Sequence, residues 1–143
     1  MKNAITEKEL KKLFTKPYGA PSPSRDVWSK YYDENVLFTD PTQSKSGLRE
    51  YIEAQEKLIK RCHDIFLETH SIALNNKVGF VEWTLGLKIL SKEFIYPGTT
   101  KLTFGEDGKI KEHRDYFDFC GPTFEPIPIL GKFIKWLYSV FVS

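Results

Sequence analysis

The chain has 143 residues, of which 41% are hydrophobic, 28% charged and 15% aromatic. This length and composition predict a single soluble globular domain that spans residues 1–143 and has its own core. The formal net charge of +2 excludes the strong basic excess of a protein that binds nucleic acid electrostatically, so we expect no nucleic-acid partner. The many aromatic residues require either a bulky core or a cavity with ring-lined walls.

Cysteine and histidine spacing gives no sign of a metal site. Cys62 and Cys120 are too few for a disulfide scaffold, and His63 and His70 lack partners at metal-ligand spacing. We therefore predict no metal and no cofactor. The charged segment MKNAITEKELKK (1–12) lacks the apolar centre of a signal peptide, and no apolar run reaches the ~20 residues of a membrane span. The expected location is the reducing cytoplasm.

The first residues predict two short helices. Thr6 and Glu9 have the spacing of a capping box, which starts a helix that stops before Pro17. The segment PYGAPSPS (17–24) reads as a loop, either a small flexible lid or, more simply, a connector. Residues 25–32 predict the second helix.

Further along, residues 35–39 (NVLFT) predict a strand that ends at Asp40-Pro41. Apolar residues recur at helical spacing over residues 47–62, which is the clearest helix in the chain. From residue 64 the hydrophobic period changes to two, which is typical of strands. The predicted strands cover residues 64–74, 78–90, 99–104 and 109–119. Asn75-Asn76 forms a turn, Pro97-Gly98 breaks the chain before the third strand, and residues 105–108 (GEDG) form a hairpin loop.

A proline-rich segment (122–128) precedes a last predicted helix over residues 129–141. Helices come first, then one antiparallel meander, then this helix, so the sequence predicts the α+β class. A strongly curved antiparallel sheet around the helices would leave a concave face for a ligand.

Three segments carry a family resemblance. They are YYDENVLFTDP (31–41) followed by a Gly-Leu-Arg-Glu helix start (47–50), LTFGEDGKIKEHRDYFD (102–118) and IPILGKFIKWLY (127–138). The chain resembles an uncharacterised branch of the nuclear transport factor 2-like, or SnoaL-like, superfamily, which includes ketosteroid isomerases, limonene-epoxide hydrolases and polyketide cyclases. The resemblance implies a cystatin-like α+β cone, with N-terminal helices packed in a strongly curved antiparallel sheet and, here, an added C-terminal helix.

The same resemblance points to acidic residues. Asp40, before Pro41, is similar to the general base of ketosteroid isomerases, but Thr100 occupies the position of their oxyanion-hole acid. Asp115 is similar to a catalytic aspartate of epoxide hydrolases and of polyketide cyclases. Trp83 and Leu85 occupy the positions of the epoxide hydrolase arginine and aspartate, so the water-activating residues of that reaction are missing. The polyketide cyclases, which need an acid and a shaped apolar pocket, are therefore the nearest catalytic analogy.

Residues two apart on a strand share a face. One face of the 109–119 strand therefore carries Lys111, His113, Asp115, Phe117 and Phe119, and the other carries Ile110, Glu112, Arg114, Tyr116 and Asp118. On the 78–90 strand the predicted inward residues are Val81, Trp83, Leu85 and Leu87. The resemblance turns the face with Asp115 toward the pocket.

We predict Asp115 and His113 as a proton-handling pair, with Asp40 as a second acid. The predicted ligand-binding residues are Trp28, Tyr32, Phe38, Trp83, Leu85, Thr100 and Phe117. Each acid/base candidate has a structural alternative: Asp115 as a structural carboxylate, His113 as a core or rim histidine, and Asp40 as the cap of its turn. Arg114 and Asp118 are expected on the outer face, in cross-strand pairs or at a dimer contact.

The last helix is strongly apolar, with Lys132 and Lys135 as its only charges. It either closes the cone or packs in a dimer, or else residues 129–143 lie on a membrane surface as a short amphipathic anchor.

These features predict a domain that binds a small hydrophobic or polycyclic molecule in a conical pocket. As an enzyme, it would be a cofactor-free cyclase or isomerase or, less readily, an epoxide hydrolase. The alternatives are a carrier or sensor without catalysis, and a protein- or membrane-docking module that uses the C-terminal helix. A homodimer through the outer face of the sheet is also expected.

Overall fold

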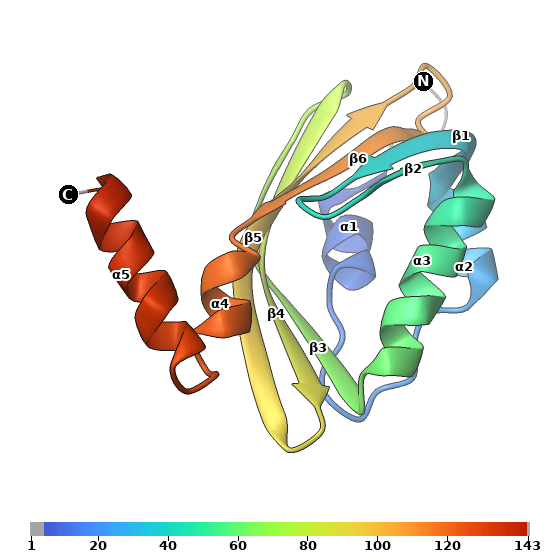
Figure 1. Ribbon diagram of the computed structural model, residues 1–143. Coiled ribbons are helices and arrows are strands. Elements are labelled where there is room, and N and C mark those ends of the chain that lie inside the picture. The colour runs from blue at the N-terminus through green and yellow to red at the C-terminus, as the bar shows by residue number, and fades with distance from the viewer. Residues whose placement is uncertain (1–4, 143) are drawn as a thin grey trace.

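The computed structural model describes residues 5–142 (Figure 1). The helices are α1 (Glu7–Leu13), α2 (Arg25–Tyr31), α3 (Leu48–Arg61), α4 (Cys120–Phe124) and α5 (Leu130–Val142). The strands are β1 (Tyr32–Thr39), β2 (Ser44–Ser46), β3 (Asp64–Leu74), β4 (Val78–Ile89), β5 (Lys92–Phe104) and β6 (Ile110–Phe117). All six strands form one sheet in the order β2-β1-β6-β5-β4-β3, so the predicted α+β class is confirmed.

The sheet is mixed, whereas the sequence predicted an antiparallel one. β1 pairs with β6 in parallel, while the other neighbouring strands pair antiparallel. The prediction was wrong at this pair because α3 and the β3–β5 meander separate the two strands, and such a long crossover allows β6 to return in the direction of β1. The predicted strong curvature of the sheet stays a prediction.

Helices α1, α2 and α3 lie on one face of the sheet, and α4 and α5 lie on the other side (Figure 1). α1 begins with the predicted capping box, in which the Thr6 side chain accepts from the Glu9 amide and the Glu9 carboxylate accepts from the Thr6 amide. α3 turns Tyr51 and Ile52 into the core. The buried apolar core is built from Ile5, Leu10, Phe14, Trp28, Tyr32, Val36, Phe38, Tyr51, Ile52, Val81, Trp83, Leu87, Tyr96, Leu102 and Ile110.

β5 is longer than predicted because it continues through Pro97-Gly98 instead of starting after them. The last pair between β5 and β6 joins Gly98 to Phe117. Pro97 lies beyond it, where β4 is the only strand paired with β5 in the described part of the chain, and proline is tolerated in a strand that has a free edge. Two short elements, β2 and α4, were not predicted, because three to five residues are too few to show a hydrophobic period.

A β-bulge changes one predicted face on β6. Thr103 pairs with Glu112 and Phe104 pairs with Ile110, so Lys111 is an extra residue between the two pairs. The alternation shifts there, and Ile110, predicted to lie opposite His113, is fully buried in the core. The Lys111 ammonium bonds the Asp33 carboxylate at 2.5 Å.

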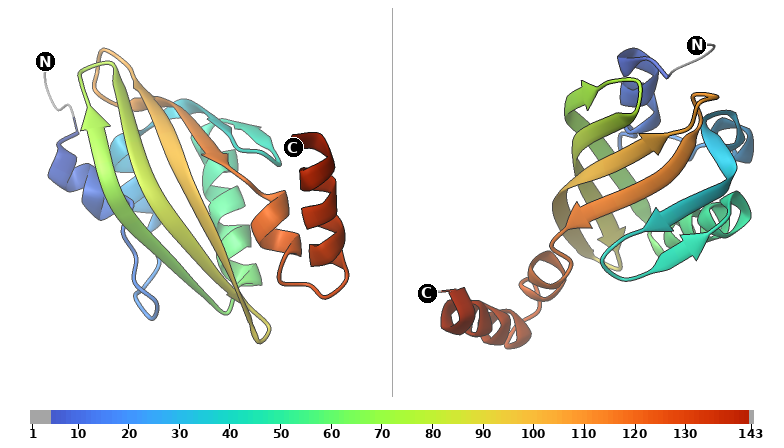
Figure 2. Two further views of the ribbon diagram at one scale, coloured as in Figure 1. Left: turned by 90° about the vertical axis from the view of Figure 1, so that its left-hand side faces the viewer. Right: turned by 90° about the horizontal axis from the view of Figure 1, so that it is seen from above.

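α5 does not close the side of the sheet that carries α1–α3. It packs against α4 and stands beyond the opposite face (Figures 1 and 2). The expectation that this helix closes the cone is therefore wrong. A homodimer through the outer face of the sheet stays a prediction.

The close approach of β5 to the Trp83 ring gives a test of this packing. A Cβ at Gly98 would lie 2.8 Å from two ring atoms of Trp83, so Gly98→Ala must displace the indole. Overpacking of this kind lowers the free energy of unfolding by ~1–3 kcal/mol, measurable by urea denaturation. The neighbouring Thr99→Ala is the control and should stay within ~0.5 kcal/mol. Equal stability of the two variants would contradict the packing described.

Candidate functional site

A buried chain of hydrogen bonds runs beneath β6 and ends on Asp115. His113, only 4% exposed, and Asp115 lie two residues apart on the same face of the strand. The His113 Nε2 atom lies 2.8 Å from Asp115 Oδ1. On the other side of the ring, the Tyr32 hydroxyl lies 2.7 Å from His113 Nδ1, and the Tyr51 hydroxyl donates to that of Tyr32 at 3.3 Å.

A second arm reaches the same carboxylate oxygen from β5 and β4. Thr100 pairs with Asp115 across the two strands, and its hydroxyl donates to Asp115 Oδ1 at 2.5 Å. The Trp83 indole N–H donates to the Thr100 hydroxyl at 2.8 Å. Thr100 is completely buried, and both of its partners are within the protein. This arm is therefore fixed by the register of three strands.

The donors fix the direction of every bond in the network. An indole N–H can only donate, so the Thr100 proton is free to point at Asp115. In the other arm Tyr51 donates to Tyr32, the Tyr32 proton then points at His113 Nδ1, and the imidazole carries its proton on Nε2 toward Asp115. Both arms thus direct a donor onto Asp115 Oδ1.

Burial holds the tyrosine protons in place. Removal from water raises the pKa of Tyr32 well above its ordinary value, with nearby Tyr51 and Asp115 adding to the shift. Burial also raises the pKa of the Tyr51 hydroxyl. Around the His113 ring, Phe38 and Phe14 pack with centroids 5.1 and 6.0 Å away. Both hydroxyls therefore remain donors throughout the neutral pH range.

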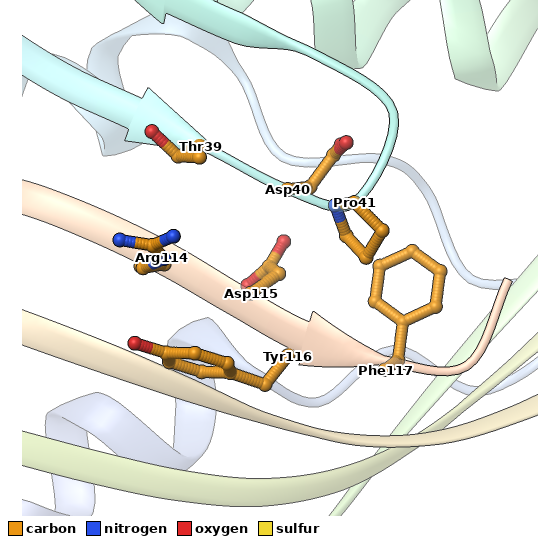
Figure 3. Close-up of a pocket in the computed structure, with 7 residues that line it drawn as sticks. All are labelled: Thr39, Asp40, Pro41, Arg114, Asp115, Tyr116 and Phe117. Carbon is orange, nitrogen blue, oxygen red and sulfur yellow. The ribbon is translucent and has the colours of Figure 1, made fainter.

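The other oxygen of Asp115 is open. Within residues 5–142 Oδ2 accepts no hydrogen bond, and the side chain is 18% exposed. It lines a hollow of about 360 Å³ where β1 ends beside β6, formed by Thr39, Asp40, Pro41, Arg114, Asp115, Tyr116 and Phe117. Figure 3 shows the Asp115 carboxylate directed toward Asp40 and Pro41, with the Phe117 ring beside Pro41. Asp115 therefore joins the buried network to a solvent-accessible surface.

Asp40 also lines the hollow, but both oxygens of its carboxylate accept hydrogen bonds from residues of its own turn. Oδ1 accepts from the Thr42 amide at 2.7 Å, the Thr42 hydroxyl at 2.8 Å and the Gln43 amide at 3.0 Å. Oδ2 accepts from the Gln43 side-chain amide at 3.2 Å. These contacts match the turn-capping alternative. A role for Asp40 as a second acid stays a prediction.

The structure brings most of the predicted site residues into one region, but not around one cavity. Tyr32, Trp83 and Thr100 join the network, whereas Trp28 and Phe38 are buried in the packed core and Leu85 is half-buried. Of the predicted ligand-binding residues, Phe117 lines the hollow. In the described part of the chain, no three His, Cys, Asp or Glu side chains form a group that could hold a metal ion.

Sequence reasoning missed Tyr51 and Phe14. The helical period of residues 47–62 places Tyr51 on the buried face, but nothing in that pattern shows that its hydroxyl meets another tyrosine. Asp118, expected in a cross-strand pair or a dimer contact, instead accepts from the Gly121 amide and the Tyr138 hydroxyl, both at 3.1 Å. Asp118 therefore links the two C-terminal helices. Arg114 places its guanidinium over the Tyr116 ring, 5.4 Å from the ring centroid.

The raised pKa values of the buried tyrosines predict alkaline instability. The folded state binds the Tyr32 proton more tightly than the unfolded chain, whose tyrosine pKa is about 10. This stabilisation is complete below pH ~10 and is lost as the pH rises toward the folded-state value, at up to ~1.4 kcal/mol per pH unit for each group. Urea denaturation at several alkaline pH values should show a shallower pH slope for Tyr32→Phe than for the parent chain.

Tyr116→Phe is the control, because this ring is half exposed on the outer face. It should retain the parent slope. A Tyr32→Phe slope that equals that of the parent would show that the Tyr32 hydroxyl is not held protonated by the fold.

Solved structures with the same arrangement belong to the nuclear transport factor 2-like fold. A Jannaschia sp. CCS1 protein assigned as a SnoaL-like polyketide cyclase is 16% identical, with a TM-score of 0.59 over 66% of this chain and 72% of that one. A protein with a ketosteroid isomerase-like fold from Catenulispora acidiphila DSM 44928, solved in complex with trimethylamine, is 11% identical, with a TM-score of 0.63 over 71% of this chain and 80% of that one. TerC, co-crystallised with polyporic acid, is 14% identical, with a TM-score of 0.60 over 66% and 79%. At these identities the likeness establishes the fold alone.

A comparison with curated proteins found no match. The family model described as "Uncharacterized conserved protein (DUF2358)" matches residues 4–113. The match covers most of the chain, from α1 to His113 on β6, and ends before Asp115 and the C-terminal helices. The chain thus has the nuclear transport factor 2-like fold and belongs to the family described as "Uncharacterized conserved protein (DUF2358)".

Proposed function

We propose that the chain binds a small hydrophobic or polycyclic molecule in the hollow beside Asp115 and moves a proton on it without a cofactor. One observation carries the proposal: Oδ1 of Asp115 receives two directed donors, while Oδ2 is free and faces the hollow. A carboxylate held in this way has a fixed position and one oxygen available as a base.

The geometry suits removal of a proton from carbon next to a carbonyl group. Asp115 Oδ2 takes the proton, the C–H bond breaks, and its electron pair passes into the enolate of the bound molecule. The new carboxylic acid then returns the proton at another carbon, which completes an isomerisation. Alternatively, the enolate attacks a second carbonyl of the bound molecule, which closes a ring, and the carboxylic acid gives its proton to the resulting alkoxide. His113 acts as a positioning residue, because it holds Oδ1 and does not line the hollow.

The hollow suits a ligand of modest size with an apolar body. Its volume of about 360 Å³ lies at the small end of the ~300–1,000 Å³ typical of ligand sites. Phe117 and Pro41 supply the apolar walls, and the Phe117 ring also packs edge-on against Trp83 at 5.9 Å. The ligand class is supported by analogy with TerC, whose structure was obtained with polyporic acid.

Epoxide hydrolysis has less support than proton transfer between carbons. The buried face of β4 carries Val81, Trp83 and Leu87, so it offers no charged partner that could activate water or an epoxide beside Asp115. The single indole donor of Trp83 is already used by Thr100. Asp115 is left as the one acid of the network.

A carbon acid of known reactivity tests the proposal without knowledge of the natural ligand. The bicyclic ketone 2-tetralone, in D₂O, exchanges its α-protons slowly, and mass spectrometry measures the exchange. We expect the parent chain to accelerate exchange and Asp115→Asn to lose about a hundredfold of this acceleration. Binding of 2-tetralone, followed by protein NMR, should persist in Asp115→Asn.

Asp26→Asn is the matched control, because Asp26 is an exposed residue of α2, away from the hollow. It should exchange 2-tetralone at the parent rate. Binding with no acceleration by the parent chain would refute proton transfer and identify a carrier. If Asp115→Asn instead loses binding and thermal stability together, Asp115 is a structural carboxylate.

A further inference from the structure

The outer side of α5 carries an unusual amount of exposed apolar surface. Phe133, Trp136 and Val140 follow one another at intervals of three and four residues, so they lie along one side of the helix. We call them the outer stripe; their exposed fractions are 51%, 58% and 54%. The Phe133 and Trp136 rings stack, with centroids 6.0 Å apart. Phe141 and Val142 extend the apolar surface to the end of the helix, both more than four-fifths exposed.

The opposite side of α5 is fixed to the domain, which determines where the outer stripe points. Gly131 is buried, and a Cβ there would lie 3.0 Å from the Glu125 carbonyl carbon, so the helix starts in close contact with the backbone after α4. Farther along, the Tyr138 hydroxyl donates to the Asp118 carboxylate at 3.1 Å. α5 stands at the outside of the molecule in all views (Figures 1 and 2). The stripe therefore faces away from the domain and remains accessible.

The charges near the stripe have one sign. Lys132 and Lys135 are both exposed, and no Asp or Glu occurs from residue 126 to residue 143. Two copies paired through α5 would bring lysines together without a carboxylate on either helix, which is unfavourable. An anionic lipid surface complements the same lysines, and Trp136 has the ring with a polar edge that favours the boundary between lipid and water.

The dimensions of α5 suit a position in the plane of the surface. Thirteen residues give a helix of about 20 Å, which is shorter than the ~30 Å hydrocarbon core. Across residues 5–142, no helix is both long and apolar enough to cross a membrane. We propose that α5 docks the chain on an anionic lipid surface, with the outer stripe in the acyl boundary and the two lysines at the headgroups. This inference does not depend on the proposed function.

Trp136 provides a built-in reporter for this contact. The chain has three tryptophans, and Trp28 and Trp83 are buried at 6% and 4% exposure. Quenching of fluorescence by acrylamide therefore reports mainly on Trp136. Vesicles of equimolar phosphatidylcholine and phosphatidylglycerol should sediment with the full chain, shift its emission to shorter wavelength and protect it from acrylamide.

Two variants distinguish vesicle binding through the outer stripe from nonspecific hydrophobic adsorption. Phe133→Asp, which leaves Trp136 as reporter, should weaken vesicle binding about tenfold or more, the value of one buried aromatic side chain. Phe80→Asp places the same charge at an apolar residue of β4 that is 43% exposed, and it should bind like the parent. Circular dichroism checks that both variants are folded.

Any of four results would overturn the proposal. The chain could fail to sediment with the anionic vesicles, or Phe133→Asp could bind as well as Phe80→Asp. Alternatively, the parent could be a dimer without vesicles that Phe133→Asp converts to a monomer, which would make the stripe a contact between copies. Equal binding to vesicles of phosphatidylcholine alone would overturn the role given to anionic lipid and to Lys132 and Lys135.

Discussion

Two hydrogen bonds that converge on one oxygen of Asp115 govern the chemistry available to this fold. The donors come from His113 on the same strand and from Thr100 on the next one. The Tyr32 hydroxyl donates to His113 Nδ1, and the Trp83 indole donates to the Thr100 hydroxyl oxygen. His113 and Thr100 can therefore each point their own proton at Asp115. A buried network of this kind stabilises the structure only when every member has a partner. The open Oδ2 is then the one oxygen of the carboxylate left for a ligand.

The same convergence explains why the interior is packed rather than hollow. Five elements (β1, α3, β4, β5 and β6) contribute to the network, and aromatic rings pack around it between the helices and the sheet. Phe38, Tyr51 and Phe14 surround the imidazole on three sides, with ring centroids between 5.1 and 6.0 Å from His113. The accessible oxygen consequently lies at the margin of the sheet, where β1 ends and Asp40 makes its turn.

Much of the fold follows from the local hydrophobic pattern of the sequence, and the rest depends on which strands pair with each other. The bounds of β3 and the common face of His113 and Asp115 could be predicted from a period of two, which needs no knowledge of neighbours, whereas the family resemblance implied that this face points inward. The parallel β1–β6 pair, the bulge at Lys111 and the passage of β5 through Pro97 depend on which strand lies alongside. The hydroxyl contact between Tyr51 and Tyr32 joins residues 19 positions apart, which no local periodicity can show. The sequence therefore pointed to Asp115 and His113 as candidates, but not to the hydrogen bonds from Thr100 and Tyr51 that complete the network.

The charged C-terminal end of β6 makes hydrogen bonds in two separate parts of the molecule. Asp115 faces inward to the network, whereas Asp118, just past the strand, accepts from the Gly121 amide and the Tyr138 hydroxyl. The first carboxylate is satisfied by strands and core rings, and the second fixes the C-terminal helices outside the sheet. A short polar segment can do both because Asp115 lies within β6, paired with β5, whereas Asp118 follows the end of the strand, where the chain turns into α4. The match to the family model ends at residue 113, so both carboxylates and α5 lie beyond the matched residues.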